Sequence, residues 1–298
     1  MTTPTSGPQQ TPGQYPAGPY PPTGGPQPPS PYPPTPPERK RSAGAAVLLF
    51  VGIPLVILAL IIGGSVAAVN VLRGTSVNEN AQADAGSLVT IDMPNAAIVV
   101  SPGSGDQVTV TMRGSYTGTP PRLDVTASGD ETEVSGGCPD GWFFVNRCQV
   151  RVEVALPADV DVTVRGQNGA IIADELRGDL DLATTNGAIE VEESSGALVL
   201  HTTNGRVELD DSRSAEVQAQ TTNGTVELSF AAAPEEVTAT STNGQIRIEV
   251  PDDGTEYFVD ANTTNGNVDT EDVPGDRRAN RTITANTTNG AVTIETSD

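Results

Sequence analysis

Few side chains after residue 73 could perform acid–base or nucleophilic chemistry. That part of the chain holds one histidine, His201, no lysine, and two cysteines. A Ser-His-Asp or Cys-His mechanism needs a histidine beside its nucleophile, and a Schiff base needs a lysine amine. His201 occupies an outward position of a predicted strand, so we interpret it as a surface residue. The sequence therefore predicts that the protein is not an enzyme and has no cofactor.

Acidic dipeptides are the remaining candidates for chemistry. Asp210-Asp211 and Asp252-Asp253 could supply the carboxylates that some polysaccharide-cleaving β-helices use, or oxygen ligands for weak Ca²⁺ binding. Such dipeptides in loops are typical of solvated turns, and no His or Cys cluster has the spacing of a metal site. We therefore predict neither a catalytic nor a metal site.

The two cysteines, Cys138 and Cys148, enclose a loop that begins with a Pro-Asp-Gly turn signal. In an oxidising compartment they are expected to form a disulfide, worth roughly 2–3 kcal/mol in the loop-entropy model. The loop also contains Trp142, Phe143 and Phe144, the only aromatic cluster outside the apolar segment. This cluster could pack under the disulfide as a local core, or form an exposed contact patch for a partner.

The first part of the chain divides into a tail and a membrane anchor. Residues 1–37 contain 15 prolines and no charged residue, so the tail over residues 1–42 is predicted to be disordered. A long apolar run then predicts a transmembrane helix over residues 43–72, enough to cross a hydrocarbon core of about 30 Å. Three basic residues at 39–41 precede it, which predicts a cytoplasmic N-terminus and a C-terminal domain outside the cell membrane.

Residues 73–86 are predicted to be a polar linker, and residues 87–298 the folded extracytoplasmic domain. After residue 73 the chain carries 12 arginines against 37 Asp and Glu, a net charge of −25. A surface this acidic repels nucleic acid, which we exclude as a partner. The expected partner is an unknown envelope ligand, either a protein or a polysaccharide. The Pro-rich tail favours polyproline II and could bind a cytoplasmic partner or act as a plain tether.

Asn-Gly dipeptides recur through residues 158–298 at intervals of 18 to 24 residues. Most of them follow Thr-Thr, which makes Thr-Thr-Asn-Gly the repeated motif. Repeats of this length indicate stacked supersecondary units. The turn dipeptides are Asn168-Gly169, Asn186-Gly187, Asn204-Gly205, Asn223-Gly224, Asn243-Gly244, Asn265-Gly266 and Asn289-Gly290.

Apolar and polar residues alternate on both sides of each Asn-Gly. The apolar positions lie six and four residues before the Asn and three and five residues after it, as in Leu198, Leu200, Val207 and Leu209 around Asn204. Alternation with period two predicts strands with one buried face. Gly is expected at the turn because it tolerates a positive φ.

Two all-β architectures fit this alternation. In a right-handed β-solenoid, or β-helix, each repeat is one coil, and equivalent Thr and Asn side chains stack in ladders. In an antiparallel β-meander, each Asn-Gly is a type I′ hairpin turn. The near-identity of the tetrapeptide favours the solenoid, because a ladder favours the same side chains at every level whereas a hairpin needs only Asn-Gly. The longer spacings place insertions at the corner opposite Asn-Gly, often the binding face of a repeat protein.

Residues 87–157 precede the Asn-Gly repeats and carry further β patterning. The alternating positions are Leu88, Thr90 and Asp92, then Val108, Val110 and Met112, then Val150, Val152 and Val154. We predict that this region, with its disulfide loop, caps the membrane-proximal end of the stack.

The tandem Thr-Thr-Asn-Gly units with Val-x-Val or Val-x-Leu strands resemble a bacterial adhesin-like family, a domain of unknown function expected to form a right-handed β-helix. The resemblance covers roughly residues 87–298 and is clearest at Thr184–Gly187, Thr202–Gly205, Thr221–Gly224, Thr263–Gly266 and Thr287–Gly290. It provides no catalytic residues, and some relatives are linked to envelope-stress signalling. The motif itself says little about activity. Together with the anchor predicted from the apolar segment, we expect a membrane-anchored, non-catalytic binding domain at the cell surface. The alternative is an envelope-stress sensor that signals through the Pro-rich tail.

Overall fold

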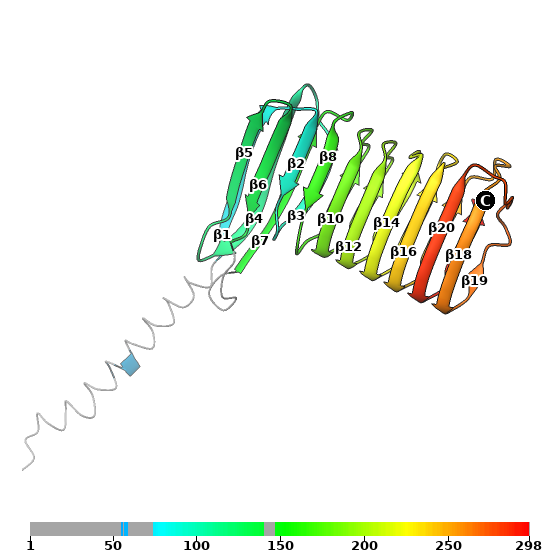
Figure 1. Ribbon diagram of the computed structural model, residues 1–298. Helices are drawn as coiled ribbons and strands as arrows, with labels where there is room; N and C mark the ends of the chain where they lie inside the picture. Colours follow the sequence, from blue (N-terminus) through cyan, green and yellow to red (C-terminus); the bar gives the residue numbers. More distant parts are fainter. Residues whose placement is uncertain (1–54, 56, 59–73, 140–146, 298) are drawn as a thin grey trace, which may run out of the picture. The chain divides into compact units, whose positions relative to one another are not determined.

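The computed structural model describes residues 55, 57–58, 74–139 and 147–297 (Figure 1). The predicted disordered tail and the aromatic cluster Trp142, Phe143 and Phe144 lie outside the described residues.

The predicted transmembrane helix also lies outside the described residues, apart from Leu55, Ile57 and Leu58, which are helical. In the part of the chain that is described, no helix has both the length and the apolar character needed to cross a bilayer. The chain divides into two compact units, residues 1–60 and 61–298, and every described strand belongs to the second.

The described residues of the second unit form two β-sheets around one core. Sheet A has 11 strands, in the spatial order β1 (Thr75–Asp84), β4 (Gln107–Thr117), β7 (Arg147–Leu156), β3 (Ala97–Pro102), β9 (Ile171–Asp174), β11 (Ile189–Glu192), β13 (Val207–Ser212), β15 (Val226–Phe230), β17 (Ile246–Val250), β21 (Val292–Thr296) and β19 (Val268–Asp269). Sheet B has 10 strands, in the spatial order β18 (Phe258–Asn265), β20 (Thr282–Asn289), β16 (Glu236–Asn243), β14 (Glu216–Asn223), β12 (Leu198–Asn204), β10 (Leu180–Asn186), β8 (Asp161–Arg165), β2 (Leu88–Asp92), β6 (Glu131–Gly137) and β5 (Arg122–Ser128).

Strands of neighbouring repeats pair in parallel, which confirms the β-solenoid and excludes the antiparallel meander. Each repeat contributes one strand to sheet B and the next to sheet A, and we call this pair with its Asn-Gly corner a coil. Parallel register aligns Asn204 with Asn186 on one side and with Asn223 on the other. Equivalent residues therefore recur at the spacing of adjacent strands, about 4.8 Å.

The predicted inward positions form the core. Leu182, Leu200, Val207 and Ile246 are at most 1% exposed, and equivalent residues of adjacent coils lie side by side. Full burial of one such side chain stabilises the fold by about 1.5–3 kcal/mol. Because the rows continue from coil to coil, each coil covers the apolar edge of its neighbour.

The Thr and Asn of the motif hold neighbouring coils together at the corner. Thr202 is buried, and its Oγ1 donates a hydrogen bond to the carbonyl oxygen of Gly187 over 2.9 Å. Asn204 Nδ2 donates to Asn186 Oδ1 over 2.9 Å, and Asn223 Nδ2 donates to Asn204 Oδ1 over 2.8 Å. The predicted ladders of Thr and Asn are therefore confirmed.

The reason predicted for the corner glycines, a positive φ, is wrong at most corners. Among the seven, only Gly169 and Gly290 have a positive φ, of 154° and 155°. The general cause is the close approach of the backbone: a Cβ on Gly205 would lie 1.9 Å from the carbonyl oxygen of Gly187. The same close approach to a neighbouring corner carbonyl occurs at the other six corner glycines, Gly169, Gly187, Gly224, Gly244, Gly266 and Gly290.

Two further coils precede the Asn-Gly repeats, in the predicted cap region. Strands β2 and β3 form a coil around Asn95, and its inward residues are Val89, Ile91 and Met93. The pattern expected at Leu88, Thr90 and Asp92 is therefore the outward one. The sequence predicted the wrong face because Ala96 replaces the corner glycine, so this coil could not be aligned with the Asn-Gly repeats.

The second hidden coil is made by β6 and β7, and Cys138 stands where other coils have Asn. Register with β2 places Cys138 beside Asn95. An insertion closed by the disulfide separates the two strands. Beyond this coil the pairing becomes antiparallel, with β4 and β1 in sheet A and β5 in sheet B, so the solenoid ends there.

The segment predicted as a linker, residues 73–86, contains a strand instead. Thr75–Asp84 pairs with β4 over its whole length, from Thr75 beside Tyr116 to Asp84 beside Gln107. Its side chains are mostly exposed, so the strand depends on backbone hydrogen bonds at the sheet edge and leaves little apolar pattern in the sequence.

The spatial order of coils differs from the chain order at both ends of the stack (Figure 1). The coil of β20 and β21 lies between those of β16–β17 and β18–β19. Likewise, the coil of β2 and β3 lies between those of β6–β7 and β8–β9. The long connections at residues 251–257 and 270–281 carry the chain past the skipped level and back. As predicted, insertions lie at the corner opposite Asn-Gly. These two connections, however, are long because each carries the chain past a neighbouring coil.

The corner-glycine interpretation predicts that Gly205→Ala destabilises the domain by about 3 kcal/mol or more, because the new Cβ forces two coils apart. The matched control is Gly129→Ala, where φ is +63° and no atom lies within 4 Å of a built Cβ. Backbone strain alone should cost the control about 1 kcal/mol. Urea unfolding measures both, and an equal loss in the two variants would contradict the close-approach explanation.

Candidate functional site

The outward face of sheet A carries a column of carboxylates. Asp174, Glu192 and Asp210 are direct neighbours on β9, β11 and β13. The next residue of each coil turns the corner in a left-handed conformation: Glu175, Glu193 and Asp211, with φ of 53°, 49° and 50°. These are the only non-glycine residues with positive φ in the described part of the chain. Three adjacent coils thus place paired acidic side chains on one strained corner.

Glu192, at the centre of this acidic column, is repelled by the carboxylates around it. The negative charge of Asp174, partial desolvation, and then the charges of Asp210, Glu193 and Asp211 raise the pKa of Glu192. Within the described residues, no three His, Cys, Asp or Glu side chains are placed to hold a metal ion. The column is a charged surface on three adjacent coils of sheet A.

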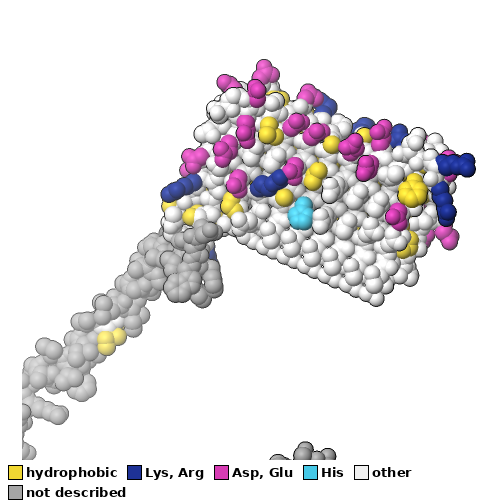
Figure 2. All heavy atoms as spheres, viewed as in Figure 1, with side chains coloured by type: hydrophobic (Ala, Val, Ile, Leu, Met, Phe, Trp, Pro, Cys, Tyr) yellow, Lys and Arg dark blue, Asp and Glu magenta, His cyan; other side chains and the backbone are white. Residues whose placement is uncertain are grey.

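Sheet B presents a different outward face. In Figure 2, viewed as Figure 1, acidic side chains gather on one part of this face, and a broad area toward the strand ends is free of charged groups. One ion pair lies at the side of that area, between Arg165 of β8 and Asp181 of β10. The solenoid thus carries an acidic face on sheet A and a partly neutral face on sheet B.

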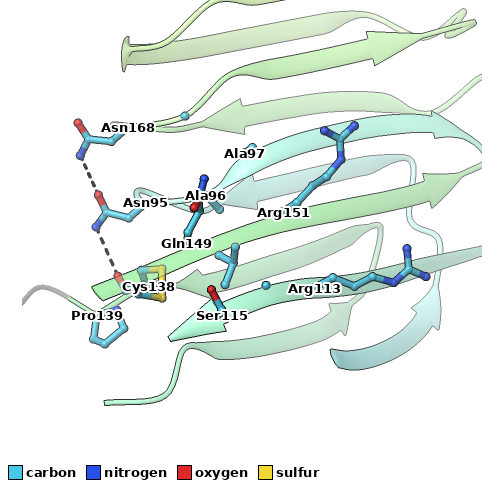
Figure 3. A pocket seen from close by; sticks show the side chains of 14 residues that line it. Asn95, Ala96, Ala97, Arg113, Ser115, Cys138, Pro139, Gln149, Arg151 and Asn168 are labelled. Atoms are coloured by element: carbon cyan, nitrogen blue, oxygen red, sulfur yellow. Dashed lines mark hydrogen bonds between the residues drawn. A yellow bond between two sulfur atoms is a disulfide. The ribbon is translucent and has the colours of Figure 1, made fainter. Parts of the chain in front are cut away.

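A hollow of about 750 Å³ lies at the corner end of β3, β4 and β7 (Figure 3). Its lining includes Arg113 and Arg151, both more than half exposed, which share Glu153: Arg113 Nη1 lies 2.7 Å and Arg151 Nε 3.7 Å from its carboxylate oxygens. The lining residues include no histidine and no free thiol. The hollow therefore offers polar contacts but no nucleophile with its base.

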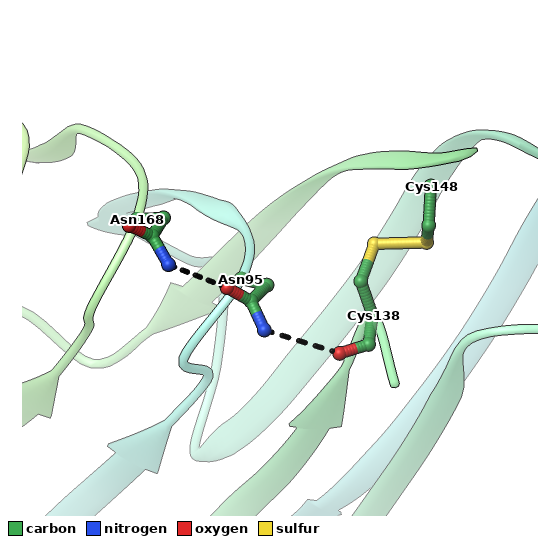
Figure 4. Close-up of a disulfide and its surroundings, with 4 residues drawn as sticks. All are labelled: Asn95, Cys138, Cys148 and Asn168. Atoms are coloured by element: carbon green, nitrogen blue, oxygen red, sulfur yellow. Dashed lines mark hydrogen bonds between the residues drawn. A yellow bond between two sulfur atoms is a disulfide. The ribbon is translucent and has the colours of Figure 1, made fainter. Parts of the chain in front are cut away.

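The disulfide predicted between Cys138 and Cys148 is present beside this hollow, with the Cα atoms 5.7 Å apart (Figure 4). Asn168 Nδ2 donates to Asn95 Oδ1 over 2.7 Å, and Asn95 Nδ2 donates to the carbonyl oxygen of Cys138 over 3.4 Å. The amide ladder therefore ends on the disulfide. From this end, its members are Asn95, Asn168, Asn186, Asn204, Asn223, Asn243, Asn289 and Asn265.

The residues considered for catalysis are not brought together. His201 is half-buried on sheet B between Ala183 and Gln220, whereas Asp210-Asp211 belongs to the acidic column on sheet A. Asp252-Asp253 lies in the connection after β17, where hydrogen bonds from Thr255 lower the pKa of Asp253. The Asp253 carboxylate closes a local turn, so it has the solvated-turn role predicted for such dipeptides.

The acidic column has a sequence signal that lies outside the Thr-Thr-Asn-Gly motif. Acidic pairs follow Asn168, Asn186 and Asn204 at the same offsets, six and seven residues later. Reading these offsets as one more repeated position would have placed them on a common corner.

Glu192→Gln removes one of the mutually repelling charges in the acidic column, so its effect on stability should depend on pH. A pKa raised in the folded state means that folding favours the protonated form, so this contribution to stability falls as the pH rises through the raised value. Glu192→Gln should therefore raise the melting temperature at pH 7. The gain should vanish below the ordinary Glu pKa of about 4.3 and shrink in about 1 M NaCl.

Glu216→Gln, an exposed change on sheet B, is the matched control for the removed charge. Equal melting-temperature gains in the two variants at pH 7 would show that the repulsion is spread over the whole domain rather than centred on the column.

Comparison with known proteins found one family model that matches part of the chain and several distant structural likenesses. No curated protein matches the chain in sequence. Among solved structures, a proposed adhesin from Bacteroides fragilis is 11% identical and covers 75% of this chain and 97% of its own, with a TM-score of 0.46. One from Parabacteroides merdae is 13% identical over 76% and 98%, with a TM-score of 0.41, and a proposed cell adhesion protein from Clostridium sporogenes is 12% identical over 76% and 100%, with a TM-score of 0.35.

These structural likenesses are too distant to carry function. The family match begins later in the chain than the resemblance expected over residues 87–298. It agrees with that resemblance in pointing to a domain of unknown function: residues 177–298 match the family model Toastrack DUF4097.

Proposed function

We propose that the protein is a membrane-anchored component of the cell envelope, whose solenoid is a non-catalytic binding surface outside the cell. The observation that carries this proposal is the parallel register of the coils, which aligns equivalent outward residues in columns along two long faces. Surfaces of this kind suit extended ligands, as in other solenoid proteins. The described residues bring together no nucleophile and base, which is why binding rather than catalysis is proposed.

The proposed location rests on the sequence. The apolar segment of residues 43–72, preceded by three basic residues, supports an anchor with a cytoplasmic N-terminus. The disulfide supports an oxidising compartment for the solenoid, because such bonds are rare in reducing ones.

A labelling experiment on intact cells tests this placement. Both native cysteines are in the disulfide, so a single added cysteine reports its own side of the membrane. We expect a membrane-impermeant maleimide to label Glu216→Cys, on the solenoid, but to label Ser6→Cys, in the tail, only after lysis. Labelling of Ser6→Cys alone on intact cells would contradict the proposed topology.

The second candidate is a sensor that signals through the tail, and a repeated segment favours it. Pro-Tyr-Pro-Pro-Thr occurs at residues 19–23 and again at 31–35, which suits recognition by an aromatic groove. Deletion of residues 1–37 separates the two functions. A lost transcriptional response with intact envelope binding would support the sensor, and the reverse would support the scaffold.

A further inference from the structure

The sheet-B face contains a strip without charged residues, which runs along the stack across six coils. It consists of the outward residues one and three positions before the corner Asn of the six coils that lie between Asn186 and Asn289 in the chain, and we call it the neutral strip. The coil around Asn168 lies outside the strip, because Arg165 occupies one of these positions there. Parallel register places these residues in two straight columns. The columns are Thr185, Thr203, Thr222, Thr242, Thr288 and Thr264, and Ala183, His201, Gln220, Thr240, Asn286 and Asn262.

The neutrality of this strip stands out against the rest of the domain. After residue 73 the chain has a net charge of −25, yet twelve neighbouring surface positions include no Asp, Glu, Lys or Arg. The equivalent outward positions of sheet A include Glu190, Glu208, Glu227 and Arg247. A β-strand therefore does not itself require neutral residues at such positions in this protein. Figure 2 shows the uncharged area on the sheet-B side.

The hydroxyl groups of the threonine column make no hydrogen bond within the described residues. The first Thr of each motif is bound to a neighbouring corner carbonyl, as Thr202 is to Gly187. For the second Thr, such as Thr203 or Thr222, no hydrogen bond to another described residue is present, and its side chain faces outward. The column therefore presents a row of free hydroxyl groups at intervals of about 4.8 Å.

The dimensions of the strip fit a linear ligand. Five intervals of about 4.8 Å give a length of roughly 24 Å, and two alternate strand positions give a width of roughly 7 Å. Even with a generous margin, this is well below the 800 Å² or so that each partner buries in a standard protein interface. A second copy of the chain is therefore a poor fit for this surface alone.

Charge and hydrogen-bonding chemistry narrow the choice of ligand. The acidic surroundings repel nucleic acids and acidic polysaccharides. An added peptide strand would pair with backbone groups at a sheet edge, not with the face of a sheet. Hydroxyl and amide side chains such as Thr222, Gln220 and Asn286 can both donate and accept hydrogen bonds, as the hydroxyl groups of a sugar do.

We propose that the neutral strip binds an extended, uncharged polysaccharide that lies along the solenoid axis. The threonine hydroxyls and the Gln220 amide form its main hydrogen bonds, because Asn262 Nδ2 already donates to Asn286 Oδ1 and to Asp260 Oδ1. This inference rests on the proposed function of the solenoid as a binding surface and names the ligand class for it.

The test uses the full chain in nanodiscs of phosphatidylcholine, with binding measured to immobilised dextran, mannan and, as the anionic probe, polygalacturonate. Thr222→Glu places a charge in the middle of the strip. Thr293→Glu adds the same charge at an outward, half-buried position of sheet A and is the matched control. Gln220→Ala is a milder second variant, and circular dichroism checks that each variant is folded.

We expect the wild type to bind dextran or mannan and not polygalacturonate. Thr222→Glu should weaken this binding by about tenfold or more, Gln220→Ala by a few fold, and Thr293→Glu by less than about twofold. Binding that is unchanged in folded Thr222→Glu and Gln220→Ala would overturn the proposal. A wild-type dimer in sedimentation that Thr222→Glu dissociates would also overturn it, in favour of self-association.

Envelope extract distinguishes failure of this inference from failure of the proposed function. Capture of an envelope protein by wild type, with no binding to either neutral polysaccharide, would overturn the polysaccharide assignment and leave the binding function standing. An absence of both kinds of binding would contradict both.

Discussion

The close approach of backbones at the Asn-Gly corner is the constraint on which the rest of the structure depends. The glycine of each Asn-Gly corner lies against a corner carbonyl of a neighbouring coil, with no space for a Cβ between them. This contact fixes the level of each coil, so the Thr hydroxyl meets a carbonyl and the Asn amide meets the next Asn. The same register aligns the apolar rows inside and the outward columns on both faces. A shift of one residue would turn every inward side chain outward.

The order of the coils protects the two ends of this stack. In a simple solenoid the last segment of the chain would form the last coil and could fray from it. Here β20 and β21, the last strands of the chain, are covered by the coil of β18 and β19, and β2–β3 is covered in the same way at the other end. Each end coil is therefore an internal segment held by connections on both sides. The ladder of amides ends on Cys138, where the disulfide closes the first insertion.

The sequence was sufficient for the coils that share a full motif. Around Asn204, the parity of Leu198, Leu200, Val207 and Leu209 predicted both strands and the buried face, and the repeated Thr and Asn identified the solenoid. It was insufficient where one corner residue changes, because Asn95-Ala96 and Cys138 keep the geometry without the motif.

The crossing of coils could not be foreseen, since the pattern around Asn265 and Asn289 is the same whichever coil lies outermost. The spacing of the Asn-Gly dipeptides showed that the last connections are longer. The pairing of β16 with β20 explains their length, because the chain must pass one coil and return. The columns of the candidate surfaces likewise require the register, because Thr203 and Thr222 are 19 residues apart in the chain and adjacent in space. The sequence of a single strand does not show which outward residues form a common surface until the register between strands is known.

The most direct test of the stacked, in-register solenoid is disulfide formation between cysteines introduced at outward positions of chosen coils. Thr242 and Thr288 are neighbours in parallel register, whereas Thr264 lies one coil further on. A disulfide requires Cα atoms about 4.4–6.8 Å apart, so one level of about 4.8 Å permits it and two levels do not. We predict rapid cross-linking of the pair Thr242→Cys and Thr288→Cys and none of Thr242→Cys with Thr264→Cys. Cross-linking of the second pair in place of the first would contradict the order of the coils and the register on which both surfaces depend.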